Sequence, residues 1–570
     1  MTARGSNPAA RSMSTSGSSP AARVAWIAPV MLIAVFIGMA WALRAPDITL
    51  EGDDALYLLL SESLRDFNYR ETFLVGHPTH SQYPPGYPAL LAVASLLMGS
   101  RPEHLVIVGI LAAAGGLAGL WLAARSIWGP WIAAGTVAVA GLNPGLIHIS
   151  GLLMSEAPFF ALAIIALWAA QRQGGRRAVA IAIVASIAAA LTRAVGVTVV
   201  VAVLIAWLLE RRWRAASILA LCAALTVGPW LVWTFTAPNQ NPDRSYASDA
   251  AFGLTDSLQR ATGPEPATAS GTRPDELPGL AKVPAALVRR VAANTQAYAT
   301  RELPWVLPAA GIPGTTVDNW LWLVAIVVFG AAGLRQMWHR WRVGALFLAC
   351  YAALLLVWPW AIPRLLIPIV PLIVLTLLLG ATALGARLGP RGWIVPLTLG
   401  SLIAFTAIAR NVVRLEQASA CDRSRAASSP ACFSDDQRGF FSAAKHARAT
   451  TGSGARFALA SKWSTFGYYA RREVLPFRAP AGMSGETILD SLAAAGVRHV
   501  LLSHASSFDV ALARQLRASC DRLVLARAFN RQTLLFEMRD RAAADETAGG
   551  CAALAAYDSV PGVPGQVGLW

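Results

Sequence analysis

The chain has 570 residues, of which 55% are hydrophobic and only 14% are charged. Soluble globular proteins contain about 25% charged residues, so this composition indicates a membrane protein. The net charge of +16 comes mainly from arginines that lie between apolar runs, where they act as topology signals and not as a nucleic-acid-binding stripe. We therefore expect membrane lipids, and no nucleic acid, as partners.

The N-terminal residues 1–23 form a basic, Ser-rich leader, which we interpret as cytoplasmic and disordered. The apolar run 24–43 is longer than the core of a secretory signal and is interpreted as an uncleaved first span. A crossing needs about 20 apolar residues, or fewer where Trp or Arg flank it. This template predicts about eleven helices within a transmembrane domain at 24–410. The expected spans are 24–43, 104–124, 131–148, 157–171, 178–192, 195–209, 215–235, 319–334, 343–358, 365–384 and 392–409.

The positive-inside rule supports this order of crossings, because each expected cytoplasmic connection is basic. The segment Tyr87–Gly99 offers only about 13 apolar residues, short of a span. We interpret it as a juxtamembrane or re-entrant helix, since counting it as a crossing would invert every later loop. A cytoplasmic N-terminus then places the loops 44–103 and 237–318 and the region 411–570 together on the extracytoplasmic side. A helix is expected near Ala285–Ala299 in the second of these loops.

The C-terminal region 411–570 has the composition of a small α/β domain. Its expected strands are 456–461, 499–503, 523–529 and 533–538, and its expected helices are 486–497 and 508–520. The tail after Ala542 is expected to be partly disordered.

Four of the six cysteines lie in this domain, and the other two lie within apolar runs. An even number in an oxidising compartment favours disulfides, and the local pairings are Cys421–Cys432 and Cys520–Cys551. Four free thiols remain the alternative, because sequence does not fix connectivity. The spacings are unlike those of a zinc site.

An acidic cluster, Glu51, Asp53 and Asp54, opens the first loop. Like charges raise the pKa of at least one carboxyl and leave another ionised, which suits a general base. The alternative is a solvated helix cap. Tyr83 and Tyr87 flank a Pro-rich segment that predicts a rigid, aromatic-walled approach to a substrate site, with interface anchoring as the alternative.

Three further charged residues lie at the same predicted face: Glu156, Arg193 and Arg364. Glu156 is interpreted as a substrate-site residue or as a carboxylate stabilised by a helix N-terminus. Each arginine is interpreted as a phosphate ligand or as a membrane anchor. His77 and His80 give only a weak metal signal, so no metal site is predicted. Dependence on a divalent cation stays open, because an acidic pair can act with or without one.

Several short motifs occur in one order along the chain. They are Asp53-Asp54-Ala55-Leu56-Tyr57, Tyr83-Pro84-Pro85-Gly86-Tyr87-Pro88, Met154-Ser155-Glu156-Ala157-Pro158, Leu191-Thr192-Arg193, Pro363-Arg364-Leu365-Leu366-Ile367-Pro368-Ile369-Val370-Pro371, Gly467-Tyr468-Tyr469-Ala470-Arg471-Arg472 and Ala495-Gly496-Val497-Arg498-His499-Val500. With them the chain resembles the GT-C superfamily of polyprenyl-phosphate-dependent glycosyltransferases. It is most similar to bacterial relatives of protein O-mannosyltransferases and to the lipid A aminoarabinose transferase, with Leu365 where the family usually has Tyr.

The resemblance implies a multi-pass enzyme of the bacterial inner membrane with a periplasmic C-terminal domain. It implies that Asp53 deprotonates an acceptor, which attacks the sugar of a polyprenyl-phosphate donor with inversion. Arg364 first, and Arg193 second, would bind the leaving phosphate, while Asp54 and Glu156 orient the acceptor or tune Asp53. The acceptor, whether lipid, glycan or protein, is not specified.

Two other functional classes stay open. One is a carrier or flippase for lipid-linked glycans. The near absence of carboxylates and lysines inside the spans argues against this class. The other is a ligase or polymerase that transfers whole lipid-linked glycans.

Overall fold

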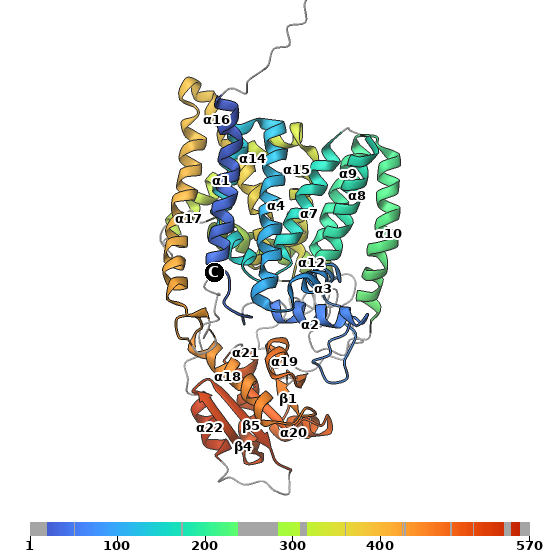
Figure 1. The fold of residues 1–570 in the computed structure, drawn as a ribbon, viewed down its shortest axis with the longest axis vertical. Helices are drawn as coiled ribbons and strands as arrows, with labels where there is room; N and C mark the ends of the chain where they lie inside the picture. Colours follow the sequence, from blue (N-terminus) through green and yellow to red (C-terminus); the bar gives the residue numbers. More distant parts are fainter. Residues whose placement is uncertain are drawn as a thin grey trace, which may run out of the picture.

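The computed structural model describes residues 20–50, 52–172, 175–237, 283–307, 316–359, 361–423, 426, 429–478, 482–504, 507–540 and 549–558. Glu51, almost all of the leader and most of the loop 237–318 lie outside the described residues. Figure 1 shows a bundle of long helices with a small α/β domain at one end. Between them lies the first loop, by which we mean the described residues of 44–103.

A helix is present at each of the expected spans. These helices are α1 (Pro20–Ala42), α4 (Pro102–Trp128), α5 (Pro130–Gly141) with α6 (Pro144–Ser150), α7 (Glu156–Gln171), α8 (Gly175–Thr192), α9 (Val197–Leu209), α10 (Trp213–Thr236), α14 (Thr316–Arg340), α15 (Arg342–Val357), α16 (Val370–Gly385) and α17 (Ile394–Ala420). In the described part of the chain, five helical segments are long and apolar enough to cross a membrane, or six with the bent pair α5–α6. The protein is thus a polytopic helical membrane protein, while the number of crossings stays a prediction.

Small residues allow the helices of the bundle to pack closely. A Cβ atom on Gly333 of α14 would lie 1.8 Å from the carbonyl oxygen of Thr376, and one on Gly380 of α16 would lie 1.8 Å from that of Phe329. Only glycine fits at either position, so α14 and α16 cross at nearly backbone contact. This crossing fixes the direction of α16, whose N-terminal approach carries Arg364.

The chain bends by 66° between α5 and α6. Asn143 stands at the bend, accepts a hydrogen bond from the backbone N–H of Leu146 and donates one to the carbonyl of Val306. Because Pro144 follows it, the helix cannot continue straight through this point. The bend brings α6 and the loop before α7 to the end of the bundle where the first loop lies.

Shorter helices complete the first loop and its neighbour. They are α2 (Asp54–Arg65), α3 (Gly86–Met98), α12 (Val283–Ala297) and α13 (Leu303–Val306), with a π-helical turn at Tyr298–Glu302. In Figure 1, α2 lies across the end of the bundle and not along it. The helix α3 has 13 residues, as expected for a segment too short to cross. The predicted helix near Ala285–Ala299 is present as α12.

The C-terminal domain is a five-stranded sheet in the order β2-β1-β3-β5-β4. Its strands are β1 (Arg456–Leu459), β2 (Glu473–Pro476), β3 (His499–Ser503), β4 (Leu523–Asn530) and β5 (Thr533–Met538). The strand β1 pairs in parallel with β2 and β3, and the β4–β5 hairpin adds in antiparallel fashion beside β3. Its helices are α18 (Asp435–Thr450), α19 (Trp463–Ala470), α20 (Gly485–Ala494), α21 (Ser507–Leu516) and α22 (Gly550–Asp558). The four expected strands are present, and the fifth strand, β2, was not predicted.

The first loop extends this sheet beyond its β2 edge. Leu74 forms a parallel bridge with Val474, whose N–H donates to the carbonyl of Phe73 at 2.9 Å and whose carbonyl accepts from Val75 at 3.1 Å. The ion pair Arg471–Glu62, at 2.8 Å, lies beside this contact. The hydrophobic core of the bundle continues through this junction into α18 and α19.

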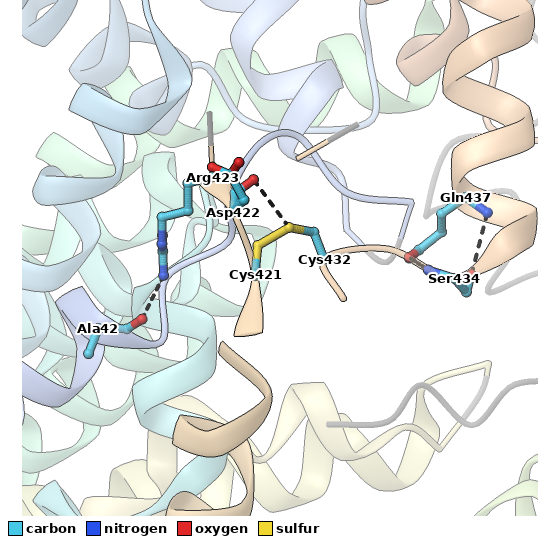
Figure 2. The surroundings of a disulfide bond; sticks show 7 residues. All are labelled: Ala42, Cys421, Asp422, Arg423, Cys432, Ser434 and Gln437. Carbon is cyan, nitrogen blue, oxygen red and sulfur yellow. Dashed lines mark hydrogen bonds between the residues drawn. A yellow bond between two sulfur atoms is a disulfide. The ribbon is translucent and has the colours of Figure 1, made fainter. Parts of the chain in front are cut away.

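A disulfide between Cys421 and Cys432 closes the turn from α17 into α18 (Figure 2). Next to it, Arg423 donates to the carbonyl of Ala42 at the end of α1. The helix α17 runs through the expected domain boundary at residue 410 to Ala420. The second disulfide joins Cys520 to Cys551 and ties α22 to the domain. Of the tail after Ala542, which was expected to be partly disordered, the structure describes residues 549–558 with α22, while residues 541–548 and 559–570 lie outside the described part.

Candidate functional site

Asp53 immediately precedes α2 at the end of the bundle. It occupies the N-cap position but makes no side-chain capping hydrogen bond. Its carboxylate instead accepts a hydrogen bond from Nη1 of Arg364 at 2.9 Å, across 311 positions of sequence. The helix-cap alternative therefore fails for Asp53, because its side chain pairs with Arg364 and does not cap α2.

The charged residues predicted separately form one chain of ion pairs. Asp53 pairs with Arg364, the Nε of Arg364 donates to Oε1 of Glu156, and Nη1 of Arg193 lies 2.8 Å from the same Oε1. Glu156 is fully buried, and the two arginines are only 15% and 11% exposed. Two carboxylates and two guanidinium groups alternate, so each charge has an opposite neighbour and the desolvation of each is offset. The membrane-anchor alternative fits neither arginine.

Local turns bring these side chains to one point. Glu156 begins α7, Arg193 follows α8 and precedes the 3-10 turn Ala194–Gly196, and Arg364 lies in the 3-10 turn Pro363–Leu365 before α16. Proline at the start of the last turn fixes its backbone and leaves no N–H unpaired. Four segments that are distant in sequence therefore meet at one end of the bundle.

The environment keeps Asp53 ionised. Burial disfavours the charged carboxylate, but the charge and hydrogen bond of Arg364, helped by Lys462 and a hydrogen bond from Tyr83, outweigh it. The pKa of Asp53 therefore lies below its ordinary value. Its side chain is 30% exposed, so the carboxylate stays accessible. An ionised, accessible carboxylate can accept a proton.

Asp54 has a different environment from its neighbour. Its Oδ2 accepts from the backbone N–H and the hydroxyl of Thr49 at 2.8 and 3.1 Å, and its Oδ1 accepts from the N–H of Ala55. Burial raises its pKa to about 6, against the lowering effect of these hydrogen bonds. The two neighbouring carboxylates thus have different partners: Asp53 belongs to the chain of ion pairs, and Asp54 binds the backbone before α2. The catalytic role predicted for Asp54 stays a prediction.

Aromatic side chains line the cavity next to the ion chain. Its walls include Tyr57, Tyr83, Arg193, Trp358, Ile362 and Arg364. The Tyr57 ring lies 5.1 Å from that of Tyr83 and meets Tyr87 edge-on at 4.8 Å. Tyr83 therefore lies at the cavity as expected, while Tyr87 is fully buried and supports Tyr57 from behind.

Gly86 allows the Pro-rich segment to approach the ion chain. A Cβ atom at this position would lie 2.6 Å from the carbonyl oxygen of Leu191, close to Arg193. The absence of a side chain, and not an unusual turn, is what this position requires, since Gly86 is the first residue of α3. The start of α3 can then pack directly on the end of α8.

Two residues of the site, Ser155 and Met154, were assigned no role from the sequence. Ser155 accepts a hydrogen bond from Arg193 at 3.0 Å and lies 3.0 Å from the hydroxyl of Tyr57, so it joins the aromatic wall to the ion chain. Met154 contacts Nη2 of Arg364 at 3.8 Å. Both lie in a predicted motif, but their partners are 38 to 210 positions away and could be found only in the folded chain.

The site retains hydrogen-bonding capacity. Among the described residues, Nε of Arg193 and Oε2 of Glu156 are buried without a partner. An unsatisfied buried group is costly unless a ligand or water meets it. No group of three or more His, Cys, Asp or Glu side chains gathers in the described part of the chain. His77 and His80 have separate partners, since His77 contacts Glu473 and His80 contacts Glu71.

The fold of this chain, a helical bundle with a charged site at one end and an α/β domain appended to it, also occurs in solved structures. The apo crystal structure of ArnT from Cupriavidus metallidurans matches with a TM-score of 0.53 at 14% identity, covering 90% of this chain and 98% of that one. ArnT bound to undecaprenyl phosphate matches with a TM-score of 0.52 at 13% identity and the same coverage.

A third similar structure is the oligosaccharyltransferase of Archaeoglobus fulgidus, tethered with an acceptor peptide containing the NVT sequon. Its TM-score is 0.52 at 12% identity, and the match covers 87% of this chain and 72% of that one. No family model and no curated protein sequence matches the chain. At these identities the similarity concerns the fold, which is the one that the sequence motifs predicted.

Proposed function

We propose that the protein is a membrane glycosyltransferase that transfers a sugar from a polyprenyl-phosphate donor to an acceptor on the extracytoplasmic face of the bacterial inner membrane. The observation that carries this proposal is the ionised, accessible carboxylate of Asp53, hydrogen-bonded to Arg364 beside an aromatic-walled cavity. Fold similarity to ArnT, whose structure contains undecaprenyl phosphate, supports a lipid-linked donor.

In this proposal Asp53 takes the proton of the acceptor nucleophile as that nucleophile attacks the anomeric carbon. The bond from the sugar to the polyprenyl phosphate breaks on the opposite side, which inverts the configuration. Because the pKa of Asp53 is low, the carboxylate is ionised at neutral pH but is a weak base. Proton transfer should therefore accompany, and not precede, departure of the phosphate.

The leaving phosphate needs positive charge near its oxygens. Among the described residues, Nη2 of Arg364 has only the sulfur of Met154 as a neighbouring acceptor, and Nε of Arg193 has no partner. Both arginines line the cavity. These two nitrogens are the donors that we propose for the phosphate, with a guanidinium geometry suited to its oxygens.

Substitution of the proposed base tests the function. We expect Asp53→Asn to lower turnover about 10²- to 10⁴-fold, because an amide keeps the shape but cannot accept the proton. Turnover is measured with the purified protein in nanodiscs, with polyprenyl-phospho-sugars as donors and mass spectrometry of the products. Asp66→Asn, an exposed carboxylate at the other end of α2, is the matched control and should leave turnover unchanged.

The same assay separates the alternatives. A product that gains one sugar per step supports the proposed transfer, whereas one that gains several sugars together indicates a ligase or polymerase. Full turnover by Asp53→Asn would exclude Asp53 as the base. Movement of lipid-linked sugar across the bilayer without any product would support a carrier. Native mass spectrometry of the purified protein, identifying any retained polyprenyl phosphate, gives an independent check on the donor.

A further inference from the structure

A buried polar pair outside the ion chain has no role in the mechanism above. Nδ1 of His80 lies 2.8 Å from Oε1 of Glu71. The His80 side chain is completely buried and that of Glu71 is only 6% exposed. Burying two such groups costs free energy unless their hydrogen bonds are well made, so their place in the first loop calls for a reason.

The hydrogen bonds of His80 define its protonation. The backbone N–H of Tyr83 donates to Nε2 of His80 at 2.8 Å, so Nε2 carries no proton. The ring hydrogen is therefore on Nδ1, and the ring donates it to the Glu71 carboxylate. Glu71 thus fixes one tautomer and one orientation of the ring, as an outer carboxylate does for many functional histidines.

This ring in turn fixes Tyr83 from several sides. The rings of His80 and Tyr83 are stacked at 5.5 Å with an interplanar angle of 17°. The hydroxyl of Tyr69 donates to the carbonyl of Tyr83 at 2.7 Å, and Nε1 of Trp233 donates to the carbonyl of His80 at 3.1 Å. The N–H, the carbonyl and the ring of Tyr83 are therefore all held.

Tyr83 is the member of this group that reaches the site. It lines the cavity, its ring packs at a tilt against that of Tyr57, and its side chain hydrogen-bonds Asp53. Resting on the proposed function, we infer that Glu71 and His80 are positioning residues that hold Tyr83 in hydrogen-bonding contact with the Asp53 carboxylate. They act through Tyr83 and do not themselves touch the substrate.

Two amide substitutions separate the two bonds of His80. In His80→Gln the amide oxygen falls near the position of Nε2 and can still accept from the N–H of Tyr83. In His80→Asn the amide nitrogen falls near Nδ1, so the bond to Glu71 is kept and the acceptor for Tyr83 is lost. We expect kcat of His80→Asn to be about tenfold to hundredfold below that of His80→Gln, since small displacements at a reacting centre have effects of this size. His104→Asn, an exposed histidine at the start of α4, is the control.

A pH profile distinguishes positioning from a structural role. The acid limb of kcat/KM, which reports Asp53, should move to higher pH in His80→Asn and in Tyr83→Phe alike. In the double variant the acid limb should move no further, because both changes remove the same hydrogen bond, the one from Tyr83 to Asp53. If the shifts of the two single variants add, or the limb of His80→Asn coincides with that of the wild type, the inference is wrong. If His80→Asn does not fold, Tyr69→Phe, which frees the carbonyl of Tyr83, replaces it. The acid limb of kcat/KM should then move in the same direction but by less.

Hydrogen–deuterium exchange makes the test independent of the proposed reaction. The amide of Tyr83 should exchange faster in His80→Asn than in His80→Gln or the wild type. Loss of this protection together with an absence of transferase activity in the wild type would overturn the proposed function alone. Unchanged protection in an active His80→Asn would overturn the positioning inference alone.

Discussion

At the scale of single residues, Arg364 determines the state of the site because it pairs with both carboxylates at once. Its Nη1 meets Asp53 and its Nε meets Glu156, so its charge favours the ionised form of each. A base held ionised in this way is ready at every neutral pH, but it removes a proton only when charge develops elsewhere in the transition state. The same guanidinium that weakens the base is placed to meet that developing charge on the phosphate.

Replacing Arg364 by lysine tests this double role. An ammonium group keeps the charge but is a single point, so it cannot pair with Asp53 and Glu156 from two sides. We expect Arg364→Lys to lower kcat about 10²-fold and to move the acid limb of kcat/KM to higher pH. The measurement is the pH profile of sugar transfer. An unchanged acid limb would show that Arg364 does not control the ionisation of Asp53.

Asp54 gives a prediction on stability. Its folded-state pKa of about 6 exceeds the ordinary value of 3.8, so the folded protein holds a proton that the unfolded chain releases. The free energy of unfolding should therefore fall as pH rises from about 4 to about 6, by about 3 kcal/mol from this group. We expect this decrease to be missing in Asp54→Asn. Thermal unfolding of both proteins across this range measures the difference, and parallel curves would contradict the prediction.

At this scale the sequence predicted the participants better than their partners. The motifs, and the family resemblance that they carry, singled out Asp53, Glu156, Arg193 and Arg364. The pairing of Asp53 with Arg364 spans 311 positions and depends on how α2, α7 and α16 pack. The family resemblance gave Asp54 and Asp53 different roles, but the hydrogen bonds from Thr49 to the Asp54 carboxylate could be found only in the folded chain.

At the scale of elements, the contact between the first loop and β2 links the two domains. Backbone hydrogen bonds to Val474 and packing of Phe73 against Gly467 form its centre, and the pair Arg471–Glu62 lies at the exposed rim. An exposed ion pair contributes only about 0–1 kcal/mol. The backbone pairing and the close packing should therefore dominate the stability of this junction.

Gly467→Ala tests that ranking. A Cβ atom at Gly467 would lie 2.8 Å from the Cβ of Phe73, so we expect the variant to lose about 1–3 kcal/mol of stability through overpacking. Gly454→Ala, where a Cβ atom would have no neighbour within 4 Å, is the matched control. Thermal unfolding measures both, together with Arg471→Gln, for which we expect a smaller loss. A loss in Arg471→Gln larger than in Gly467→Ala would reverse the ranking.

The elements themselves were largely predictable. Spans and strands with clear apolar periods were found within a few residues, because burial imposes those periods directly. The strand β2 was missed because it has only four residues, lies at the sheet edge and depends on Phe73–Val75 for its second neighbour. The helix α22 was not predicted because its small residues carry little apolar pattern, and the bond from Cys551 to Cys520 ties it to the domain.

At the scale of the whole molecule, the hydrophobic core at the site end of the bundle continues into α18 and α19 of the C-terminal domain, which has a second core on its far side from this junction formed by α20, α21 and α22. This continuity means that the domain lies on the same side of the membrane as Asp53. Each expected cytoplasmic connection contains arginine, for example Arg387 between α16 and α17. The positive-inside rule then predicts that the whole site lies on the extracytoplasmic side, as our proposal of a lipid-linked sugar donor requires.

Labelling of single added cysteines tests this orientation. Gly452→Cys lies in the C-terminal domain where a side chain meets no neighbour within 4 Å, and Arg387→Cys lies on the exposed turn at the opposite end. In intact spheroplasts a membrane-impermeant maleimide should label the first and not the second. Inverted vesicles should show the reverse pattern. The unmodified protein corrects for Cys222 and Cys350, the free cysteines within the helices. Labelling of Arg387→Cys from outside would place Asp53 in the cytoplasm, where a donor on the outer leaflet could not reach it.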